Sequence, residues 1–297
     1  MNAYILAAGK GNRLRPLTDT LPKPLVPFLN RPLLSYLLDH VRPHVGHIRL
    51  NVAHNKEPLI RYLARQAGVS YFDEGAQPLG SAVTLSQEQA FCRDSTTLVV
   101  CGDLLCNWNI EQMVNFHHQK QALVTMVTCQ VPDPRRYGVV VTDDEQRVMA
   151  FYEKPADPPG SFINCGIYLL APEVFDYWEV GWNDLGSDVF PGLVARGLPV
   201  YAWPLNTLAY WSDIGTPQSY LAAHLALGGE NNTIASSAQI AQDARLRQTV
   251  VGAGAVVHPR SHLERCVVWP GSVVRAGLRL RSAVVTQDSV LEVQSHA

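Results

Sequence analysis

Residues 4–23 read Y-I-L-A-A-G-K-G-N-R-L-R-P-L-T-D-T-L-P-K. The apolar run at residues 4–7 predicts a short buried strand, and the two glycines after it allow a sharp turn and a close approach to a ligand. Three cations, Arg13, Arg15 and Lys23, follow within the same stretch, and prolines around Lys23 hold its backbone extended. A strand, a glycine loop and nearby cations together predict a binding site for phosphate groups.

The glycine loop departs from the two commonest phosphate-binding motifs. A G-x-G-x-x-G fingerprint would need glycine where Leu14 stands, and G-x-x-x-x-G-K-[ST] is absent. Taken alone, residues 9–11 therefore also fit an ordinary turn between a strand and a helix.

Composition limits the class of protein. The chain has 297 residues, 47% of them hydrophobic and 17% charged, which indicates a compact globular protein with a large core. A net charge of −2 gives no overall field that would attract nucleic acid or an anionic membrane. The six cysteines and ten histidines lack metal-ligand spacing, and most cysteines lie in apolar runs. With neither a signal peptide nor a membrane span in the pattern, we expect a cytoplasmic protein.

Predicted strands and helices alternate over the first 120 residues. Apolar spacing predicts strands at 48–53, 69–72 and 97–101, and helices at 31–45, 57–67, 81–91 and 109–120. This alternation is typical of a parallel, doubly wound sheet, in which ligands lie beyond the carboxyl ends of the strands. The loop at residues 7–13 and the pair Gly102-Asp103 both follow such ends.

Closely spaced strands follow from residue 123. We expect strands at 123–131, 139–142, 148–152, 163–170 and 200–203, a hairpin turn at 143–145, and helices at 185–195 and 217–227. The glycine pair at 228–229 is a typical helix stop.

A fixed repeat begins after residue 231. Apolar residues recur in steps of six, six and five, at Ile234, Ile240, Leu246, Val251, Val257, Leu263, Val268, Val274, Leu280 and Val285. A period of seventeen residues with three sides per turn predicts a triangular parallel β-helix, with the edge of a β-sandwich as the alternative. The end of such a stack needs a cap or a partner subunit, so we expect a homo-oligomer formed through this tail.

Two carboxylates stand next to glycines after apolar segments. Asp103 ends the strand L-V-V-C-G-D, and Asp213 lies in W-S-D-I-G-T-P. Each alone fits a helix cap or a turn. As a pair they predict a Mg²⁺ site, because Mg²⁺ is often held by two carboxylates together with substrate phosphates.

At this point the sequence resembles a known family. L-A-A-G-K-G-N-R-L-R-P-L-T at residues 6–18 and P-K-P-L-V-P at 22–27 resemble the signature of sugar-1-phosphate nucleotidylyltransferases, the NDP-sugar pyrophosphorylases. P-L-G-S-A at 78–82, Y-G-V-V at 137–140, E-K-P at 153–155 and N-C-G-I-Y at 164–168 resemble further segments of that family. The likeness runs from residue 3 to 217 in family order, and the tail is similar to the left-handed β-helix that some members carry.

The resemblance implies an α/β fold. Residues 1–228 would form a Rossmann-like, doubly wound mixed sheet, the nucleotide-diphospho-sugar transferase fold, and residues 232–297 a short left-handed parallel β-helix. The implied reaction joins a nucleoside triphosphate and a sugar 1-phosphate to give an NDP-sugar and pyrophosphate, with Mg²⁺ as cofactor. The likeness is greatest to mannose-1-phosphate guanylyltransferases, which favours GTP and mannose 1-phosphate. UTP or dTTP with a glucose-type sugar 1-phosphate stays open.

The same resemblance implies a role for each matching residue. The catalytic residues would be Arg13, Lys23, Asp103 and Asp213, of which Asp103 and Asp213 would hold the metal. The nucleotide would contact Leu6, Ala7, Ala8, Gly9, Gly11 and Gly80, and the sugar phosphate would contact Gly138, Glu153, Lys154 and Asn164. A silent sugar-nucleotide-binding regulatory subunit and an acyltransferase are the alternatives from other classes. The presence of the four expected catalytic residues argues against the regulatory subunit. The absence of a long inserted loop from the repeats of the tail argues against the acyltransferase.

Overall fold

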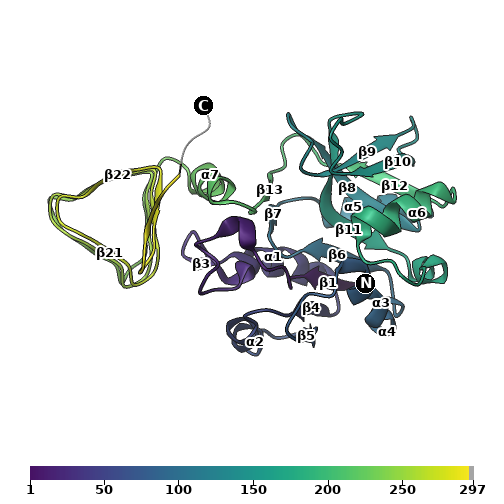
Figure 1. Cartoon of the computed structure of the whole chain (residues 1–297), viewed down its shortest axis with the longest axis horizontal. Coiled ribbons are helices and arrows are strands. Elements are labelled where there is room, and N and C mark those ends of the chain that lie inside the picture. Colours follow the sequence, from purple (N-terminus) through teal and green to yellow (C-terminus); the bar gives the residue numbers. More distant parts are fainter. Residues whose placement is uncertain (294–297) are drawn as a thin grey trace. The chain divides into compact units, whose positions relative to one another are not determined.

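The computed structural model describes residues 1–293 (Figure 1). Two compact units make up the chain, and neither is a single continuous stretch. The first unit holds residues 1–10 and 37–211, and the second holds residues 11–36 together with the chain described from residue 212 onward. The expected division into residues 1–228 and 232–297 stays a prediction, and the last four residues of that tail lie outside the described part of the chain.

A parallel sheet forms the first half of the first unit. Its strands lie in the order β6-β1-β4-β5, and every neighbouring pair is parallel. Since the carboxyl ends of these strands share one edge, the loops that follow them meet there. The strands are β1 (Asn2–Leu6), β4 (Ile48–Val52), β5 (Val69–Asp73) and β6 (Thr97–Cys101). The helices α2 (Glu57–Leu63), α3 (Ser81–Gln87) and α4 (Gln89–Cys92) lie between them in the chain, and α5 (Ile110–Gln119) follows β6.

Antiparallel strands extend the same sheet. β11 pairs antiparallel with β6, β8 and β9, and β10 pairs antiparallel with β9. The predicted mixed sheet and the hairpin at residues 143–145 are therefore confirmed. The elements of this half are β7 (Leu104–Cys106), β8 (Val124–Gln130), β9 (Gly138–Thr142), β10 (Val148–Glu153), β11 (Phe162–Leu170), α6 (Phe190–Ala195) and β12 (Val200–Pro204).

Four predicted helices differ in detail. The helix predicted at 57–67 ends at Leu63, and the one predicted at 81–91 is divided into α3 and α4. Instead of one helix over 31–45, the chain forms β3 (Arg31–Pro32), α1 (Leu33–Val41) and a 3₁₀ turn at Arg42–His44. Pro43 explains the break, because proline has no amide hydrogen for a helical bond. The helix predicted at 185–195 begins with a π-helical turn at Leu185–Val189, and the Asp184 side chain caps that turn.

The tail is a short parallel β-helix, seen as the yellow triangle in Figure 1. Each strand pairs with the strand seventeen residues later, as in Val250 with Val267 and Val256 with Val273, so the predicted period is confirmed. The three sides are β14 (Thr233–Ile234), β17 (Val250–Val251), β20 (Val267–Val268) and β23 (Ala283–Val285); β15 (Gln239–Ile240), β18 (Val256–Val257) and β21 (Val273–Val274); and β16 (Arg245–Arg247), β19 (His262–Glu264) and β22 (Arg279–Arg281).

The last coil carries its own cover on one side. β24 (Val290–Glu292) turns back and pairs antiparallel with β23, with Leu291 opposite Val284. An edge strand that is paired in this way offers fewer free backbone groups to another chain.

Helix α7 (Pro217–Gly228) joins the tail to the segment around Pro27 within the second unit. The Tyr220 hydroxyl donates to the carbonyl of Pro27 and accepts from Trp269 Nε1 at 3.0 Å. Asn30 Nδ2 also donates to the carbonyl of Val251 at 3.2 Å. These buried contacts tie the N-terminal segment, α7 and the coils into one folding unit.

His224 lies inside that contact. Its side chain is 2% exposed, and its ring centroid lies 4.3 Å from that of Phe28 and 4.5 Å from that of Tyr220. Burial penalises the charged imidazolium and lowers the pKa of His224 to about 3.

We predict that His224 makes the folded state sensitive to acid. An unfolded histidine titrates near pH 6.5, so below that pH the unfolded chain binds a proton that the folded chain rejects, and stability falls until about pH 3. Between pH 7 and pH 5 the wild type should lose on the order of 2 kcal/mol more unfolding free energy than His224→Phe. Urea unfolding followed by tryptophan fluorescence measures this difference. The exposed His258→Phe should behave as wild type, and equal losses in wild type and His224→Phe would contradict the prediction.

Candidate active site

The glycine loop and Asp103 lie side by side at the carboxyl edge of the parallel strands. Leu6 on β1 pairs with Cys101 on β6, and the next amide, that of Gly102, donates to the Leu6 carbonyl at 2.8 Å. A Cβ on Gly102 would lie 3.1 Å from that carbonyl oxygen and 3.2 Å from Ala7 Cβ, so only glycine fits without a shift. The contact brings the half-buried Asp103 next to the start of the glycine loop.

A buried polar network supports the loop from behind. Ala7 N donates to Asn51 Oδ1 at 2.6 Å, and Asn51 Nδ2 donates to Glu74 Oε1 at 2.8 Å. The other oxygen of Glu74 accepts from Leu79 N at 3.1 Å, and the Thr84 hydroxyl also donates to Glu74. The network connects the glycine loop to the segment that contains Gly80.

Sequence reasoning missed Asn51 and Glu74. The available signal was their position, since Asn51 is a polar residue inside the apolar strand β4 and Glu74 directly follows β5. Both lie near the carboxyl ends of parallel strands, where ligand-binding residues collect.

Gly80 is required by a contact within the protein. Its φ of 102° lies in the left-handed region, and a Cβ there would come 2.5 Å from the carbonyl oxygen of Asn183. Ala82 N donates to that same carbonyl at 3.0 Å, and the Ser81 hydroxyl donates to Asp184 Oδ2 at 2.9 Å. These bonds attach the start of α3 to the loop before α6, and no described atom lies within 4 Å of a Cβ built on Gly9.

The predicted Glu-Lys pair comes together at the end of β10. Lys154 Nζ donates to Glu153 Oε1, and the Lys154 side chain is 62% exposed while that of Glu153 is 23% exposed. Glu153 Oε2 lies over two glycines, 3.0 Å from a Cβ built on Gly138 and 2.5 Å from one built on Gly186. Gly138 was predicted at the site, whereas Gly186 was missed because it lies in a separate loop.

Asn164 stabilises an irregularity in β11. Its Nδ2 donates to the Tyr168 hydroxyl at 2.8 Å, and its Oδ1 accepts from Gly166 N at 2.9 Å across a register shift between β11 and β8. One Nδ2 hydrogen is left over from these two bonds and can serve a ligand hydroxyl. Burial raises the pKa of the neighbouring Cys165 thiol well above its usual range, which disfavours a nucleophilic thiolate.

Arg13 and Lys23 converge on Asp213 in the second unit. Lys23 Nζ lies 3.7 Å from Asp213 Oδ1, and Arg13 Nη2 lies 3.9 Å from Asp213 Oδ2. The Lys23 side chain is only 10% exposed, whereas that of Arg13 is 64% exposed, so one cation is enclosed and the other can reach outward. Lys23 begins a 3₁₀ turn at Lys23–Leu25 after the extended Pro22, so the prediction that the prolines hold its backbone extended is wrong. Pro24 lies at the start of this turn, where its missing amide hydrogen costs no helical bond.

Two glycines complete this cluster. Gly11 has a left-handed φ of 66°, and its carbonyl accepts from the Thr18 hydroxyl at 2.8 Å, which closes the loop that carries Arg13. A Cβ on Gly215 would come within 3.0 Å of Asp213 Oδ2 and 3.4 Å of Arg13 Nη2. Gly215 was not among the predicted site residues.

The carboxylates fit a magnesium ion by their chemistry. Among residues 1–293 no group of three or more histidine, cysteine or acidic side chains is arranged to hold a metal. Mg²⁺ is usually bound by one or two carboxylates together with water and substrate phosphates, so single carboxylates such as Asp103 and Asp213 suit it.

We predict that Asn51 is essential for the local stability of the loop. Asn51→Leu keeps a similar volume but leaves the Ala7 amide without its partner and Glu74 Oε1 with only the Thr84 hydroxyl of its two donors, so the unfolding free energy should fall by about 1–3 kcal/mol. Urea denaturation of the variant checks the value. Asn115→Leu, at an exposed position on α5, should change stability by less than about 0.5 kcal/mol. A wild-type value for Asn51→Leu would contradict the role of the network.

Two family models match the chain. A family described as nucleotidyl transferase matches residues 2–229, and one described as GlmU-like, C-terminal hexapeptide matches residues 222–296. The hexapeptide match and the stacked triangular coils agree with the expected left-handed β-helix. Within residues 1–293 no helix is both long and apolar enough to cross a membrane.

Curated relatives match most of the chain. It is 42% identical to a UTP–glucose-1-phosphate uridylyltransferase of Synechocystis sp. over 243 residues, in an alignment that covers 75% of this chain and 62% of the relative. It is 32% identical to a mannose-1-phosphate guanylyltransferase of Mycobacterium tuberculosis over 284 residues, 89% of this chain and 78% of the relative. A mannose-1-phosphate guanyltransferase of Yarrowia lipolytica is 35% identical over 230 residues, 75% of this chain and 62% of the relative.

The chain thus spans less than two thirds of two of these three relatives. The family match nevertheless covers residues 2–229, which include every residue predicted at the site. The chain therefore belongs to the nucleotidyl transferase family, among the sugar-1-phosphate nucleotidylyltransferases.

Proposed function

We propose that the protein transfers a nucleoside monophosphate from a nucleoside triphosphate to a sugar 1-phosphate, giving an NDP-sugar and pyrophosphate. The observation that carries the proposal is the approach of Lys23 and Arg13 to the Asp213 carboxylate. Two cations beside one carboxylate can neutralise phosphate oxygens while the carboxylate keeps both cations in position.

The reaction is a displacement at the α-phosphorus. An oxygen of the sugar phosphate attacks in line, the bond to the β-phosphate oxygen breaks, and pyrophosphate leaves with its electron pair. Such a reaction depends on positioning and on neutralising charge more than on a covalent intermediate. The high pKa of the Cys165 thiol agrees with a mechanism that uses no protein nucleophile.

Lys23 and Arg13 would stabilise negative charge on different phosphate groups. The enclosed Lys23 would stabilise the α-phosphate as charge develops there, and the exposed Arg13 would stabilise the leaving pyrophosphate. Asp103 and Asp213 would each give carboxylate oxygens to Mg²⁺, which supplies positive charge to the triphosphate oxygens when bound.

The other site residues would bind the substrates. Lys154, whose side chain is 62% exposed, would hold the attacking phosphate, and Glu153, Asn164 and the backbone at Gly138 would contact the sugar. The base and ribose would lie against Leu6, Ala7, Ala8, Gly9, Gly11 and Gly80. Asn51 and Glu74 act behind them as positioning residues, since they hold the loop backbone.

GTP and mannose 1-phosphate are the substrates we favour. The M. tuberculosis relative, named a mannose-1-phosphate guanylyltransferase, aligns over 284 residues and so reaches into the tail. UTP or dTTP with a glucose-type sugar 1-phosphate is the alternative, because the Synechocystis relative with 42% identity is named a uridylyltransferase. A regulatory subunit that binds without turnover is the candidate from another class.

The proposal also covers the oligomeric state and the cellular compartment. A stack of coils exposes the backbone groups of its end strands, and on that ground we propose self-association through the tail. We also propose a cytoplasmic enzyme, on the basis of six free cysteines among the described residues.

Pyrophosphate release with Mg²⁺ tests the proposal. GTP, UTP, dTTP, ATP and CTP are each combined with the 1-phosphates of mannose, glucose and N-acetylglucosamine. We expect turnover with GTP and mannose 1-phosphate to exceed every other pair. Preference for UTP or dTTP with glucose 1-phosphate would select the alternative. If no pair reacts although thermal shifts show that a nucleotide sugar binds, the protein is a regulatory subunit that binds without turnover and not an enzyme.

Two matched variants complete this assay. Asp213→Asn removes the charge beside Lys23 and Arg13, so we expect kcat to fall by about 100-fold or more. Asp19→Asn makes the same change at an exposed residue that pairs with Arg15, and it should keep wild-type turnover. Full activity in Asp213→Asn would overturn the role given to this carboxylate.

A further inference from the structure

A single carboxylate, Asp184, connects the turn before α6 to the start of α3. Its Oδ1 accepts from Gly186 N at 2.9 Å and from Ser187 N at 3.1 Å, and so caps the turn at Leu185–Val189. Its Oδ2 accepts from the Ser81 hydroxyl at 2.9 Å. Asp184 therefore holds its own turn with one oxygen and the start of α3 with the other.

The Ser81 hydroxyl both donates and accepts in this connection. It donates to Asp184, and it accepts from Leu185 N at 2.9 Å. A third bond between the same segments joins backbone to backbone, from Ala82 N to the Asn183 carbonyl at 3.0 Å. Two of these three bonds thus pass through the Ser81 side chain, and the one hydrogen of its hydroxyl is already donated within the protein.

The two connected segments carry residues that we assign to different substrates. Gly80, directly before Ser81, belongs to the residues proposed for the base and ribose. On the other side, a Cβ built on Gly186 would come 2.5 Å from Oε2 of Glu153, which is proposed to contact the sugar. The bond between Ser81 and Asp184 therefore joins the nucleotide side of the site to the sugar side.

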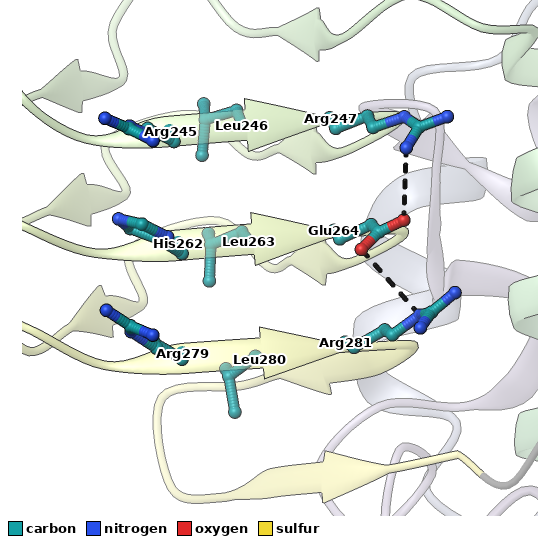
Figure 2. Close-up of a pocket in the computed structure, with 9 residues that line it drawn as sticks. All are labelled: Arg245, Leu246, Arg247, His262, Leu263, Glu264, Arg279, Leu280 and Arg281. Atoms are coloured by element: carbon teal, nitrogen blue, oxygen red, sulfur yellow. Dashed lines mark hydrogen bonds and ion pairs between the residues drawn. The ribbon is translucent and has the colours of Figure 1, made fainter.

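A carboxylate with several partners does not by itself indicate such a role. Glu264 on β19 lies 3.5 Å from Arg247 Nη1 and 3.7 Å from Arg281 Nε, as the dashed lines in Figure 2 mark. These partners lie on the neighbouring coils in the same register, and none of the residues lining that groove is proposed to bind substrate. Glu264 thus connects equivalent positions of a repeat, whereas Asp184 connects two segments with different proposed ligands.

We propose that Ser81 and Asp184 are positioning residues that set the distance between the bound nucleotide and the bound sugar phosphate. This inference rests on the function proposed above. An in-line displacement needs the attacking oxygen about 3–3.5 Å from the phosphorus, and a misplacement of about 1 Å can lower the rate roughly 100-fold. The polar atoms of both side chains already bind each other and the turn, so the pair acts through the segments that it joins and not on a reacting atom.

Ser81→Ala tests the proposal, because it removes two of the three bonds and keeps the cap of the turn. We expect kcat for the preferred substrate pair to fall at least about tenfold. The Kd of the nucleoside triphosphate, measured without sugar phosphate, should stay at the wild-type value. Ser81→Thr keeps the hydroxyl and should retain kcat, and Ser86→Ala makes the same change at a residue of α3 outside the connection and should behave as wild type.

A ligand that reaches both sides of the site gives a readout without turnover. The probes are GDP-mannose and GDP, or UDP-glucose and UDP if the enzyme prefers that pair. In calorimetric titrations S81A should bind the NDP-sugar at least about fivefold more weakly than wild type, because its two halves no longer meet a preorganised site. Binding of the nucleoside diphosphate, which occupies the nucleotide side alone, should not change.

A double variant shows whether the two residues act through one connection. Asp184→Asn keeps Oδ1 for the turn and removes the oxygen that accepts from Ser81. Because S81A has already broken that bond, S81A/D184N should lose no more kcat than S81A alone. Glu264→Gln makes the same carboxylate-to-amide change at the residue drawn in Figure 2 and should keep wild-type kcat.

Three results would overturn the positioning role. One is wild-type kcat in S81A, and another is a multiplication of the two losses in S81A/D184N. The third is a loss of triphosphate affinity in S81A as large as the loss of kcat, because Ser81 would then contact the nucleotide directly. Asp184 is exposed, so we expect all variants to keep the wild-type unfolding temperature, which identifies them as folded.

Failure of the proposed function gives a different result. A wild type that binds an NDP-sugar without turnover would overturn the enzymatic function alone, and the titrations would then decide the positioning role. A wild type that neither reacts nor binds an NDP-sugar would overturn both.

Discussion

The backbone contact between Gly102 and Leu6 is the constraint on which the site depends. A Cβ at Gly102 would lie 3.1 Å from the Leu6 carbonyl oxygen and 3.2 Å from Ala7 Cβ, so glycine lets β6 run alongside β1 to its end without a shift of these neighbours. The hydrogen bond from Gly102 N to Leu6 then continues the pairing beyond the last strand residues. Because of this close approach, the glycine loop and Asp103 meet at one edge of the sheet, while the Asn51–Glu74 network holds the loop from the other side.

The second unit gives the β-helix a role in placing the candidate catalytic cations. Arg13 and Lys23 lie in residues 11–36, which form one compact unit with α7 and the coils. Tyr220 bonds to Pro27 and receives a bond from Trp269, so the segment that follows Lys23 packs on the tail through α7. The coils and these cations therefore belong to one compact unit, and we expect acid that protonates His224 to weaken the contacts that hold it together.

Much of this arrangement could be predicted from the sequence, because the responsible patterns are local or strictly periodic. The strands are short apolar runs, and a seventeen-residue period leaves only one register for the coils. Pro43 in the sequence could have predicted the end of helix α1, although the apolar spacing suggested a longer helix. By contrast, the bond from Ala7 to Asn51 joins residues 44 apart, and Glu153 lies over Gly186 from another loop. No local pattern predicts such contacts, since they depend on which strands become neighbours. The roles of Arg13, Lys23, Asp103 and Asp213 came from family resemblance, and the structure adds the approach of three of these residues within the second unit.

The central claim is that cations and carboxylates position a direct displacement, with no covalent bond to the protein. Exchange of radiolabelled pyrophosphate into the nucleoside triphosphate tests this most directly. Direct displacement predicts that label enters the triphosphate only when the sugar 1-phosphate or the NDP-sugar is present, because pyrophosphate can then reverse the complete reaction. Exchange with the triphosphate alone, at a rate comparable to turnover, would reveal a nucleotidyl-protein intermediate and would contradict the account.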